Sequence, residues 1–216
     1  MNTPRSPILQ PRRSLWAIVP VKPLHIGKQR LARVLSGDER AAMMRGFLTR
    51  MLSVLRDVPA IDRVLVISSD AAVLDLAARM GAVACDEGAM TGLNPAVTRA
   101  AQIAAAAQAT AVLILPADLP CIQASDVEMM CRGGDSVAIC SDGQGEGTNA
   151  LLIPLPTRFQ PCYGPGSFRQ HLQEAKRVGL AARVIHAPGL KFDMDTEEDW
   201  RQYQLTMKNG QLRPGL

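Results

Sequence analysis

Three short, almost uninterrupted apolar segments constrain the fold of this chain more than any other feature of its sequence. They occupy residues 15–21, 63–68 and 111–115 and are rich in branched side chains. Such runs are typical of strands that are buried on both faces of a parallel sheet. Segments with apolar residues at helical spacing separate them. The alternation predicts a Rossmann-like, three-layer α/β domain with a mostly parallel central sheet and helices on both faces.

The remaining elements follow from the same patterns. Four more strands are predicted at residues 82–85, 136–140, 150–153 and 182–186. Helices are predicted over residues 36–58, 71–80, 94–109, a short stretch from 125, 167–178 and 196–207. Capping residues are predicted at the starts of four of these helices: Ser36 with Glu39, Asp70, Asn94 with Pro95, and Ser125 with Glu128.

Length and composition predict one globular domain. The chain has 216 residues, of which 47% are hydrophobic and 20% charged, and one α/β domain can fill that length. We expect residues 1–13 to form a disordered tail, residues 14–207 the domain, and residues 208–216 a flexible end. No apolar run approaches the ~20 residues of a membrane helix, so no membrane partner is expected.

Charge and cysteine content bound the partners and the compartment. The net charge of +4 suits an anionic ligand, but the excess is small and does not indicate a nucleic-acid partner. The five cysteines are scattered and form no CxxC pair, which argues against a disulfide framework or a zinc site and favours the cytoplasm. The oligomeric state stays open, with a homodimer as one assembly considered.

Acidic residues follow two of the predicted elements and could bind a metal ion. Asp118 comes directly after the strand at 111–115, where the carboxyl edge of a sheet holds ligands. Asp193 and Asp195 share one face if their segment is extended, with Met194 turned to the core. Carboxylates are preferred ligands of Mg²⁺. The alternatives are that Asp118 supports a turn between two prolines and that Asp195 and Thr196 cap the last helix.

Basic and glycine-rich loops could bind anions at the same edge. Lys22, Lys28, Arg30 and Arg33 follow the first strand, where phosphates are expected, although a solvated loop is the alternative and the better one for Arg33. The loop lacks both the dinucleotide fingerprint and the P-loop pattern, which argues against dehydrogenases and P-loop kinases.

Three further segments carry groups that can contact ligands. Gly92-Leu93-Asn94 lies at a helix start, where free N–H groups attract anions, with capping as the alternative role of Asn94. The segments at 145–149 and 163–168 can present backbone N–H groups to an anion, and the hydroxyls of Thr148 and Ser167 add donors. Ordinary turns use the same residues.

Taken as an ordered set, these motifs resemble the 2-phospho-L-lactate guanylyltransferase family of coenzyme F-420 biosynthesis, which includes phosphoenolpyruvate and 3-phosphoglycerate guanylyltransferases. The resemblance covers residues 16–203. It is carried by WAIVPVKP at 16–23, KQRL at 28–31, GLN at 92–94, LPADLP at 115–120, GTNAL at 147–151, YGPGSF at 163–168 and DMD at 193–195.

The resemblance implies a fold of the nucleotide-diphospho-sugar transferase type and a reaction. GMP would pass from GTP to a small phosphorylated carboxylic acid, namely 2-phospho-L-lactate, phosphoenolpyruvate or 3-phospho-D-glycerate, with release of pyrophosphate. It implies catalytic roles for Asp118, Lys22 and Lys28, and Mg²⁺ binding by Asp118, Asp193 and Asp195. The implied nucleotide-binding residues are Pro20, Val21, Lys22, Lys28, Ser68, Gly92, Leu93, Asn94, Pro116 and Asp118. The implied acid-binding residues are Thr148, Asn149, Gly164, Gly166 and Ser167.

Three points stay open. The chain departs from relatives at Pro95, where alanine is common, and at Cys121, Cys140 and Cys162, near segments that vary, so the identity of the acid is open. A nucleotidyltransferase acting on a sugar phosphate or on the molybdenum cofactor would share the fold. A non-catalytic GTP-binding module would keep the pocket and release no pyrophosphate.

Overall fold

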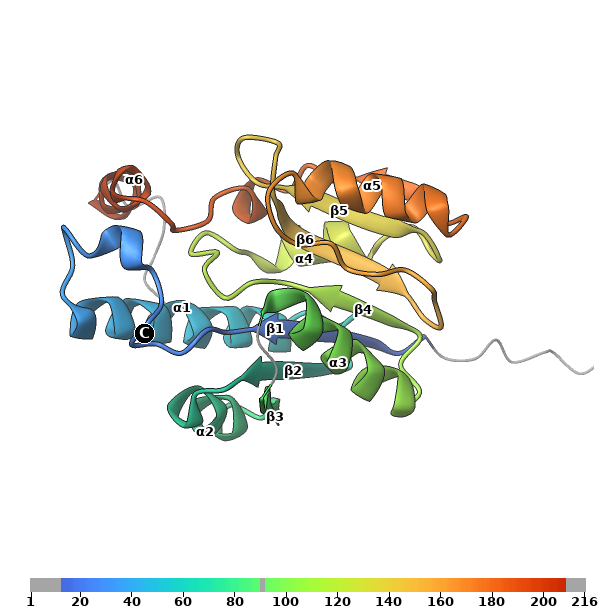
Figure 1. Ribbon diagram of the computed structural model, residues 1–216, viewed down its shortest axis with the longest axis horizontal. Coiled ribbons are helices and arrows are strands. Elements are labelled where there is room, and N and C mark those ends of the chain that lie inside the picture. The colour runs from blue at the N-terminus through green and yellow to red at the C-terminus, as the bar shows by residue number, and fades with distance from the viewer. Residues whose placement is uncertain (1–12, 90–91, 209–216) are drawn as a thin grey trace, which may run out of the picture.

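The structure is a computed structural model that describes residues 13–89 and 92–208. Its strands form one seven-stranded sheet in the order β3-β2-β1-β4-β6-β5-β7 (Figure 1). The strands are β1 (Leu15–Pro20), β2 (Arg63–Ser68), β3 (Val83–Asp86), β4 (Ala111–Ile114), β5 (Val137–Ser141), β6 (Thr148–Pro154) and β7 (Ala182–Val184). Of these strands only β6 runs antiparallel to its neighbours. The prediction of a mostly parallel sheet is therefore confirmed.

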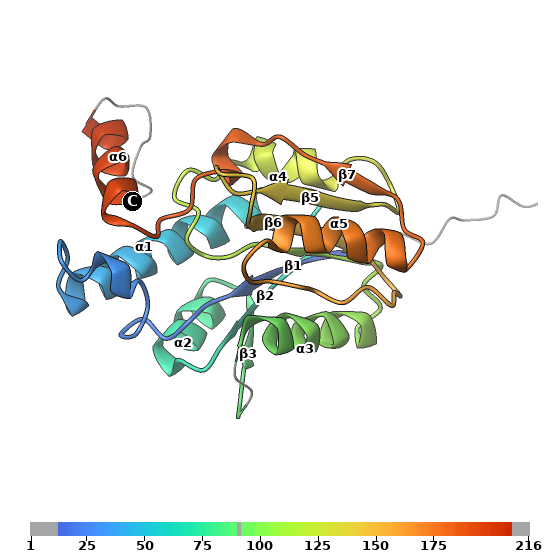
Figure 2. The ribbon, with the colours of Figure 1, turned by 45° about the horizontal axis from the view of Figure 1, so that its top comes forward.

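Helices cover both faces of the sheet, which confirms the three-layer prediction. One face packs against α1 (Gly37–Arg56), α2 (Ala71–Arg79) and α4 (Ala124–Cys131). The other packs against α3 (Leu93–Ala106) and α5 (Ser167–Arg177), as Figure 2 shows. The chain also forms short 3-10 helices η1 (Gln29–Leu31) and η2 (Pro188–Leu190) and the last helix α6 (Glu197–Lys208).

Alternation along the central strand divides the core into two layers. Ala17 and Val19 of β1 face the layer that holds α1, while Trp16 and Ile18 face the layer that holds α3. Successive side chains of a strand point to opposite faces, so a continuous apolar run is what a strand covered on both sides requires. The apolar runs in the sequence thus fix β1, β2 and β4 as the centre of the sheet.

Two of the predicted caps are confirmed. Ser36 and Glu39 form the reciprocal capping box of α1, and the Asp70 side chain accepts the Ala72 N–H at the start of α2. These local signals need no tertiary contact to act, since side chain and backbone lie within one turn.

The predicted role of Asn94 as a cap is wrong. Helix α3 begins at Leu93, and Gly92 is its N-cap with φ at 105°, a value that favours glycine. Asn94 lies inside the first turn, and its side chain bonds instead to the backbone of Tyr163. A tertiary contact therefore uses the amide that sequence assigned to capping.

The predicted capping box of Ser125 and Glu128 is also wrong. Helix α4 begins two residues earlier than that box requires, with Gln123 as N-cap and Asp126 as its partner. Asp126 accepts the Gln123 N–H at 2.9 Å and the Gly189 N–H at 3.2 Å. The contact with the distant η2 segment favours the earlier start.

The C-terminal segment brings Asp193 and Asp195 back to the sheet. Met194 is fully buried, as predicted, and its N–H donates to the Asp118 carbonyl at 3.0 Å. Beyond it α6 packs on α1 through an edge-to-face contact of Tyr203 with Phe47, whose ring centroids are 5.6 Å apart.

The predicted tails mostly lie outside the described residues, with the exceptions of Arg13 and Lys208. Arg13 donates a hydrogen bond to the Gly134 carbonyl, and Lys208 ends α6. Within residues 13–89 and 92–208, no helix has the length and apolar character needed to span a membrane.

Candidate active site

A cavity of about 500 Å³ opens at the carboxyl edge of the parallel strands. Its walls come from the segments that follow β1, β2, β3 and β4 and from the start of α3. Volumes of this size are common for small-molecule sites. The predicted nucleotide-binding residues that line the cavity are Pro20, Val21, Lys22, Lys28, Gly92, Leu93, Pro116 and Asp118.

The other two predicted nucleotide-binding residues, Ser68 and Asn94, do not line this cavity. Ser68 is fully buried, and its hydroxyl accepts the Asp70 N–H at 3.1 Å. The next residue, Ser69, lines the cavity in its place. The strand end therefore supplies a serine to the cavity, one position later than predicted.

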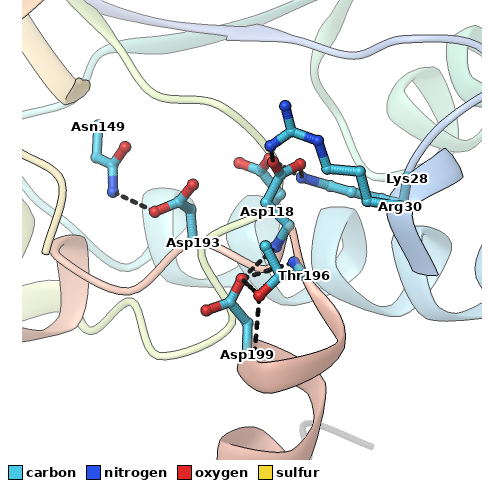
Figure 3. Close-up of polar contacts among 8 residues, drawn as sticks. Lys28, Arg30, Asp118, Asn149, Asp193, Thr196 and Asp199 are labelled. Atoms are coloured by element: carbon cyan, nitrogen blue, oxygen red, sulfur yellow. Dashed lines mark hydrogen bonds and ion pairs between the residues drawn. The ribbon is translucent and has the colours of Figure 1, made fainter. Parts of the chain in front are cut away.

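Lys28 connects two of the predicted metal ligands. Its ammonium group forms an ion pair with Asp118 and lies 3.4 Å from Asp195 Oδ1, while Arg30 lies 2.7 Å from Asp195 Oδ2 (Figure 3). Burial by itself lowers the pKa of Lys28, but the adjacent Asp118 and Asp195 carboxylates raise it above its ordinary value. Lys28 is therefore held charged in the wall of the cavity.

Asp193 lies on the other side of Asp118, next to Asn149, as Figure 3 shows. The Asn149 side chain donates to Asp193 Oδ1 at 3.2 Å. Burial raises the pKa of Asp193 above its ordinary value, the Asn149 hydrogen bond opposes the shift, and the charge of Asp118 adds to it. The carboxylates therefore lie close enough to repel each other, which is the condition that a bound cation relieves.

The carboxylates of Asp118, Asp193 and Asp195 are suitable ligands for a hard cation, although their oxygens do not converge on one point. Asp118 Oδ1 is buried without a hydrogen-bond partner, an arrangement that is costly unless a ligand supplies the missing contact. In the described part of the chain, no three acidic, histidine or cysteine side chains converge on a common point. A shared ion would thus require rotation of Asp193 away from Asn149 and of Asp195 away from Lys28.

The backbone that carries Asp195 is fixed by Asp199. One oxygen of Asp199 accepts the N–H groups of Asp195 and Thr196 at 3.0 and 2.6 Å and the Thr196 hydroxyl at 2.8 Å (Figure 3). Thr196 in turn accepts the Asp199 N–H at 3.2 Å. The helix start predicted at Thr196 is confirmed, since α6 begins at Glu197 directly after it. These contacts fix the main chain, while the Asp195 side chain is held by Lys28 and Arg30.

Two of the predicted acid-binding residues, Thr148 and Ser167, lie beside a buried histidine. His171 Nε2 accepts the Cys162 N–H at 2.8 Å, so the neutral ring carries its proton on Nδ1 and donates it to the Thr148 hydroxyl, 2.9 Å away. The Ser167 hydroxyl lies 3.3 Å from the same Thr148 oxygen. The imidazole donates to Thr148, and one of the two hydroxyls donates to the other. One hydroxyl hydrogen therefore remains for an anionic ligand.

The loop that contains Gly164 and Gly166 leads into α5 beside this histidine. Both glycines have positive φ angles, of 139° and 69°, and Gly166 is the N-cap of α5. Asn94 holds the same loop through two bonds to Tyr163, at 3.0 and 2.7 Å. The start of α3, which borders the cavity, and the loop predicted to bind the acid are therefore tied together.

The comparisons with known proteins give the family. The family model described as "Guanylyl transferase CofC like" matches residues 15–210. The chain belongs to this family. The resemblance inferred from the ordered motifs is thus confirmed, and the chain is a nucleotidyltransferase enzyme.

Two curated relatives illustrate how far the similarity to other CofC-like guanylyltransferases extends. The phosphoenolpyruvate guanylyltransferase of Rubrobacter xylanophilus is 40% identical over 189 residues, which cover 86% of this chain and 91% of that protein. The 2-phospho-L-lactate guanylyltransferase of Methanothermobacter thermautotrophicus is 32% identical over 184 residues, which cover 85% and 81% of the two chains. These names do not favour a sugar phosphate, the molybdenum cofactor or a non-catalytic module.

Solved structures support the fold. One described as a nucleotide-diphospho-sugar transferase of Desulfovibrio desulfuricans G20 has a TM-score of 0.72 at 18% identity and covers 91% of this chain and 89% of that chain. A nucleotidyl transferase of Methanothermobacter thermautotrophicus has a TM-score of 0.66 at 14% identity and covers 91% and 99%. The predicted fold type of this CofC-like chain is therefore confirmed.

The cavity also contains residues that the motifs do not single out. Glu87 follows β3 and Ser69 follows β2, and both line the cavity. Their only signal in the sequence is position, since each comes directly after a predicted strand and thus at the ligand-binding edge. His171 gives no signal at all, because its partners are distant in sequence.

Lowering the pH is expected to destabilise this CofC-like protein through His171. Burial lowers the pKa of His171 from 6.5 to about 4. The unfolded chain takes up this proton near pH 6.5 and the folded protein only near pH 4, so the contribution is fully present above pH 6.5 and is lost as the pH falls to 4. Its size is roughly 3 kcal/mol of unfolding free energy.

Urea unfolding at several pH values measures this effect. The variant His171→Gln keeps an acceptor and a donor but has no titrating ring, so its stability should fall less than that of the parent protein between pH 6.5 and 4. Equal slopes for the two proteins would show that other groups cause the acid sensitivity.

Proposed function

We propose that this protein transfers GMP from GTP to a small phosphorylated carboxylic acid and releases pyrophosphate, as a step of coenzyme F-420 biosynthesis. Phosphoenolpyruvate is the first acceptor to test, because it is named for the relative with 40% identity. The alternatives 2-phospho-L-lactate, named for another relative, and 3-phospho-D-glycerate differ from it by small groups that the fold does not discriminate.

One observation supports this function above the others. Asp118 lies at the end of the cavity with one buried oxygen unpartnered and the other paired with Lys28. A site of this kind suits two anionic reactants, because Lys28 offers a cation to phosphates and Asp118 an open ligand position to a metal ion.

The chain's residues would act mainly by alignment and charge neutralisation. Lys22 and Lys28 line the cavity and would contact the phosphates of GTP. The one hydroxyl hydrogen that the Thr148–Ser167 pair leaves free would be donated to the acid. An ionised phosphate of the acceptor needs no general base to attack the α-phosphorus in line, so positioning carries the catalysis.

Mg²⁺ is the cofactor that we propose for this reaction. Asp118, Asp193 and Asp195 would hold it, for which the buried unpartnered oxygen of Asp118 gives the support. When bound, such an ion supplies neutralisation of the phosphate charge. We further propose a cytoplasmic location, in keeping with the five free cysteines. The homodimer remains a prediction that light scattering after gel filtration would test.

A pyrophosphate-release assay tests the function. The protein would be incubated with GTP, Mg²⁺ and each of the three acids in turn, and the adduct detected by mass spectrometry. We expect pyrophosphate and a diphosphate-linked guanosine adduct with at least one of the acids and neither product without acid. Failure of all three acids to yield pyrophosphate would refute the proposal.

A further inference from the structure

Glu87 lies at one end of the cavity, on a backbone that is fixed on both sides. Its N–H donates to the Ser68 carbonyl at 2.9 Å, and its carbonyl accepts from Arg99 at 3.2 Å. The Gly88 N–H that follows donates to Asp86 Oδ1 at 2.8 Å. The main chain at Glu87 is thus preorganised, as sites that recognise ligands generally are.

The Glu87 carboxylate itself has no partner within residues 13–89 and 92–208. No hydrogen bond or ion pair of the described chain engages it, and Arg99, the nearby cation, bonds to the main-chain carbonyl instead. Glu87 nevertheless lines the cavity and is partly shielded from solvent. A carboxylate in this position is an acceptor-only group available to a ligand.

The order of the strands separates the two ends of the cavity. Along the sheet edge, Glu87 follows β3, Ser69 follows β2, Lys22 follows β1 and Asp118 follows β4. Three strand spacings separate β3 from β4, or roughly 14 Å. An elongated ligand would therefore meet Glu87 at one end and the Lys28–Asp118 pair at the other, with its anionic groups at the cationic end.

The walls near Glu87 suit a flat, partly apolar group. Leu93 and Ala96 of α3 line the cavity, and so does Ile67, which pairs with Cys85 on the strand that leads to Glu87. Apolar walls with one polar group that fixes orientation are the usual composition of a site for a base. The phosphates cannot occupy this end, because Glu87 would repel them.

We propose that Glu87 recognises the guanine base and makes the enzyme specific for GTP over ATP. The Watson–Crick edge of guanine presents two neighbouring donors, N1–H and the N2 amino group, and a carboxylate can accept both. Adenine presents an acceptor at N1, which would face the carboxylate and be repelled. This inference rests on the proposed function, since it assigns the nucleotide that the same site takes.

Nucleotide binding, measured by calorimetry without an acid acceptor, tests the inference. Wild-type protein should bind GTP on the order of 100-fold more tightly than ATP, and ITP, which lacks the N2 amino group, roughly 10-fold less tightly than GTP. In Glu87→Gln the affinity for GTP should fall roughly 10-fold or more, the gap between GTP and ITP should shrink, and ATP should bind no worse than before.

The control is Glu128→Gln, which removes the same negative charge from a side chain of α4 that lies near Arg132 and does not line the cavity. It should bind all three nucleotides as the wild type does. If Glu87→Gln weakens GTP, ITP and ATP equally, Glu87 acts on the ribose or through its charge and the inference is wrong. It is equally wrong if the variant binds GTP unchanged.

The same set of measurements separates this inference from the proposed function. Base discrimination that depends on Glu87 supports the inference even where no acid yields pyrophosphate, and that second result would refute only the transfer reaction. If the wild type releases pyrophosphate with GTP and ATP at equal rates, the transfer reaction is supported and the inference about Glu87 is refuted.

Discussion

Replacing Asp118 with asparagine is expected to lower the rate of pyrophosphate release by on the order of 100-fold or more while the protein stays folded. The buried Oδ1 has no partner and Oδ2 pairs with Lys28. Asparagine keeps the shape and one oxygen but removes the negative charge that holds Lys28 and that would bind a cation. The measurement is pyrophosphate release at saturating GTP, with circular dichroism as the check on folding.

The matched control for this variant is Asp75→Asn. Asp75 is an exposed aspartate of α2 that pairs with Arg79 at 2.6 Å and does not line the cavity. Exposed pairs of this kind contribute little to stability, so its activity should stay within about twofold of the parent. If Asp118→Asn behaves like Asp75→Asn, Asp118 has no part in the reaction.

The sequence predicts the position of Asp118 for a physical reason. Apolar runs reveal buried parallel strands, and the carboxyl ends of such strands meet at one edge, where ligands bind. A residue that directly follows β4 must therefore stand at that edge. The same reasoning places Lys22 after β1, and local caps such as Ser36 need only their own turn.

What the sequence does not predict depends on contacts between distant segments. Asn94 looks like a cap, but its amide binds Tyr163, and α4 starts at a register that Gly189 helps to select. His171 becomes a fixed donor only because Cys162 and Thr148 meet it on either side. Spacing along the chain does not reveal such pairings. Residue type alone therefore suggests only an ordinary cap or a surface residue.

The charges of the acidic residues are partly neutralised by protein side chains, which the motifs do not predict. The predicted metal ligands do not converge around a common point among the described residues. Instead, Lys28 pairs with Asp118 and Asp195, and Asn149 donates to Asp193. Lys28 thus neutralises part of the charge of Asp118 and Asp195 in this conformation. Any metal ion that binds these carboxylates must compete with it.

Because of this competition, replacing Lys28 should change two quantities in opposite directions, the rate of pyrophosphate release and the affinity for a divalent cation. Lys28→Met should reduce pyrophosphate release by roughly 100-fold, because the cation expected to face the phosphates is lost. The same change should strengthen divalent-cation binding in the absence of nucleotide, because Asp118 and Asp195 lose the ammonium that neutralises them. Methionine is unbranched like lysine, is only one atom shorter, and has the same difficulty with the φ of 54° at this position, so charge is the main difference.

The two effects are measured separately on the purified protein. Titration with Mn²⁺, followed by its electron paramagnetic resonance signal, gives cation affinity, and the pyrophosphate assay gives turnover. Lys176→Met, a change in the last turn of α5 away from the cavity, should alter neither. If Lys28→Met lowers activity and cation affinity together, Lys28 supports the arrangement of Asp118 and Asp195 and does not compete with the cation. A loss of activity with a gain in cation affinity would establish that Lys28 and a metal ion compete for the same carboxylates.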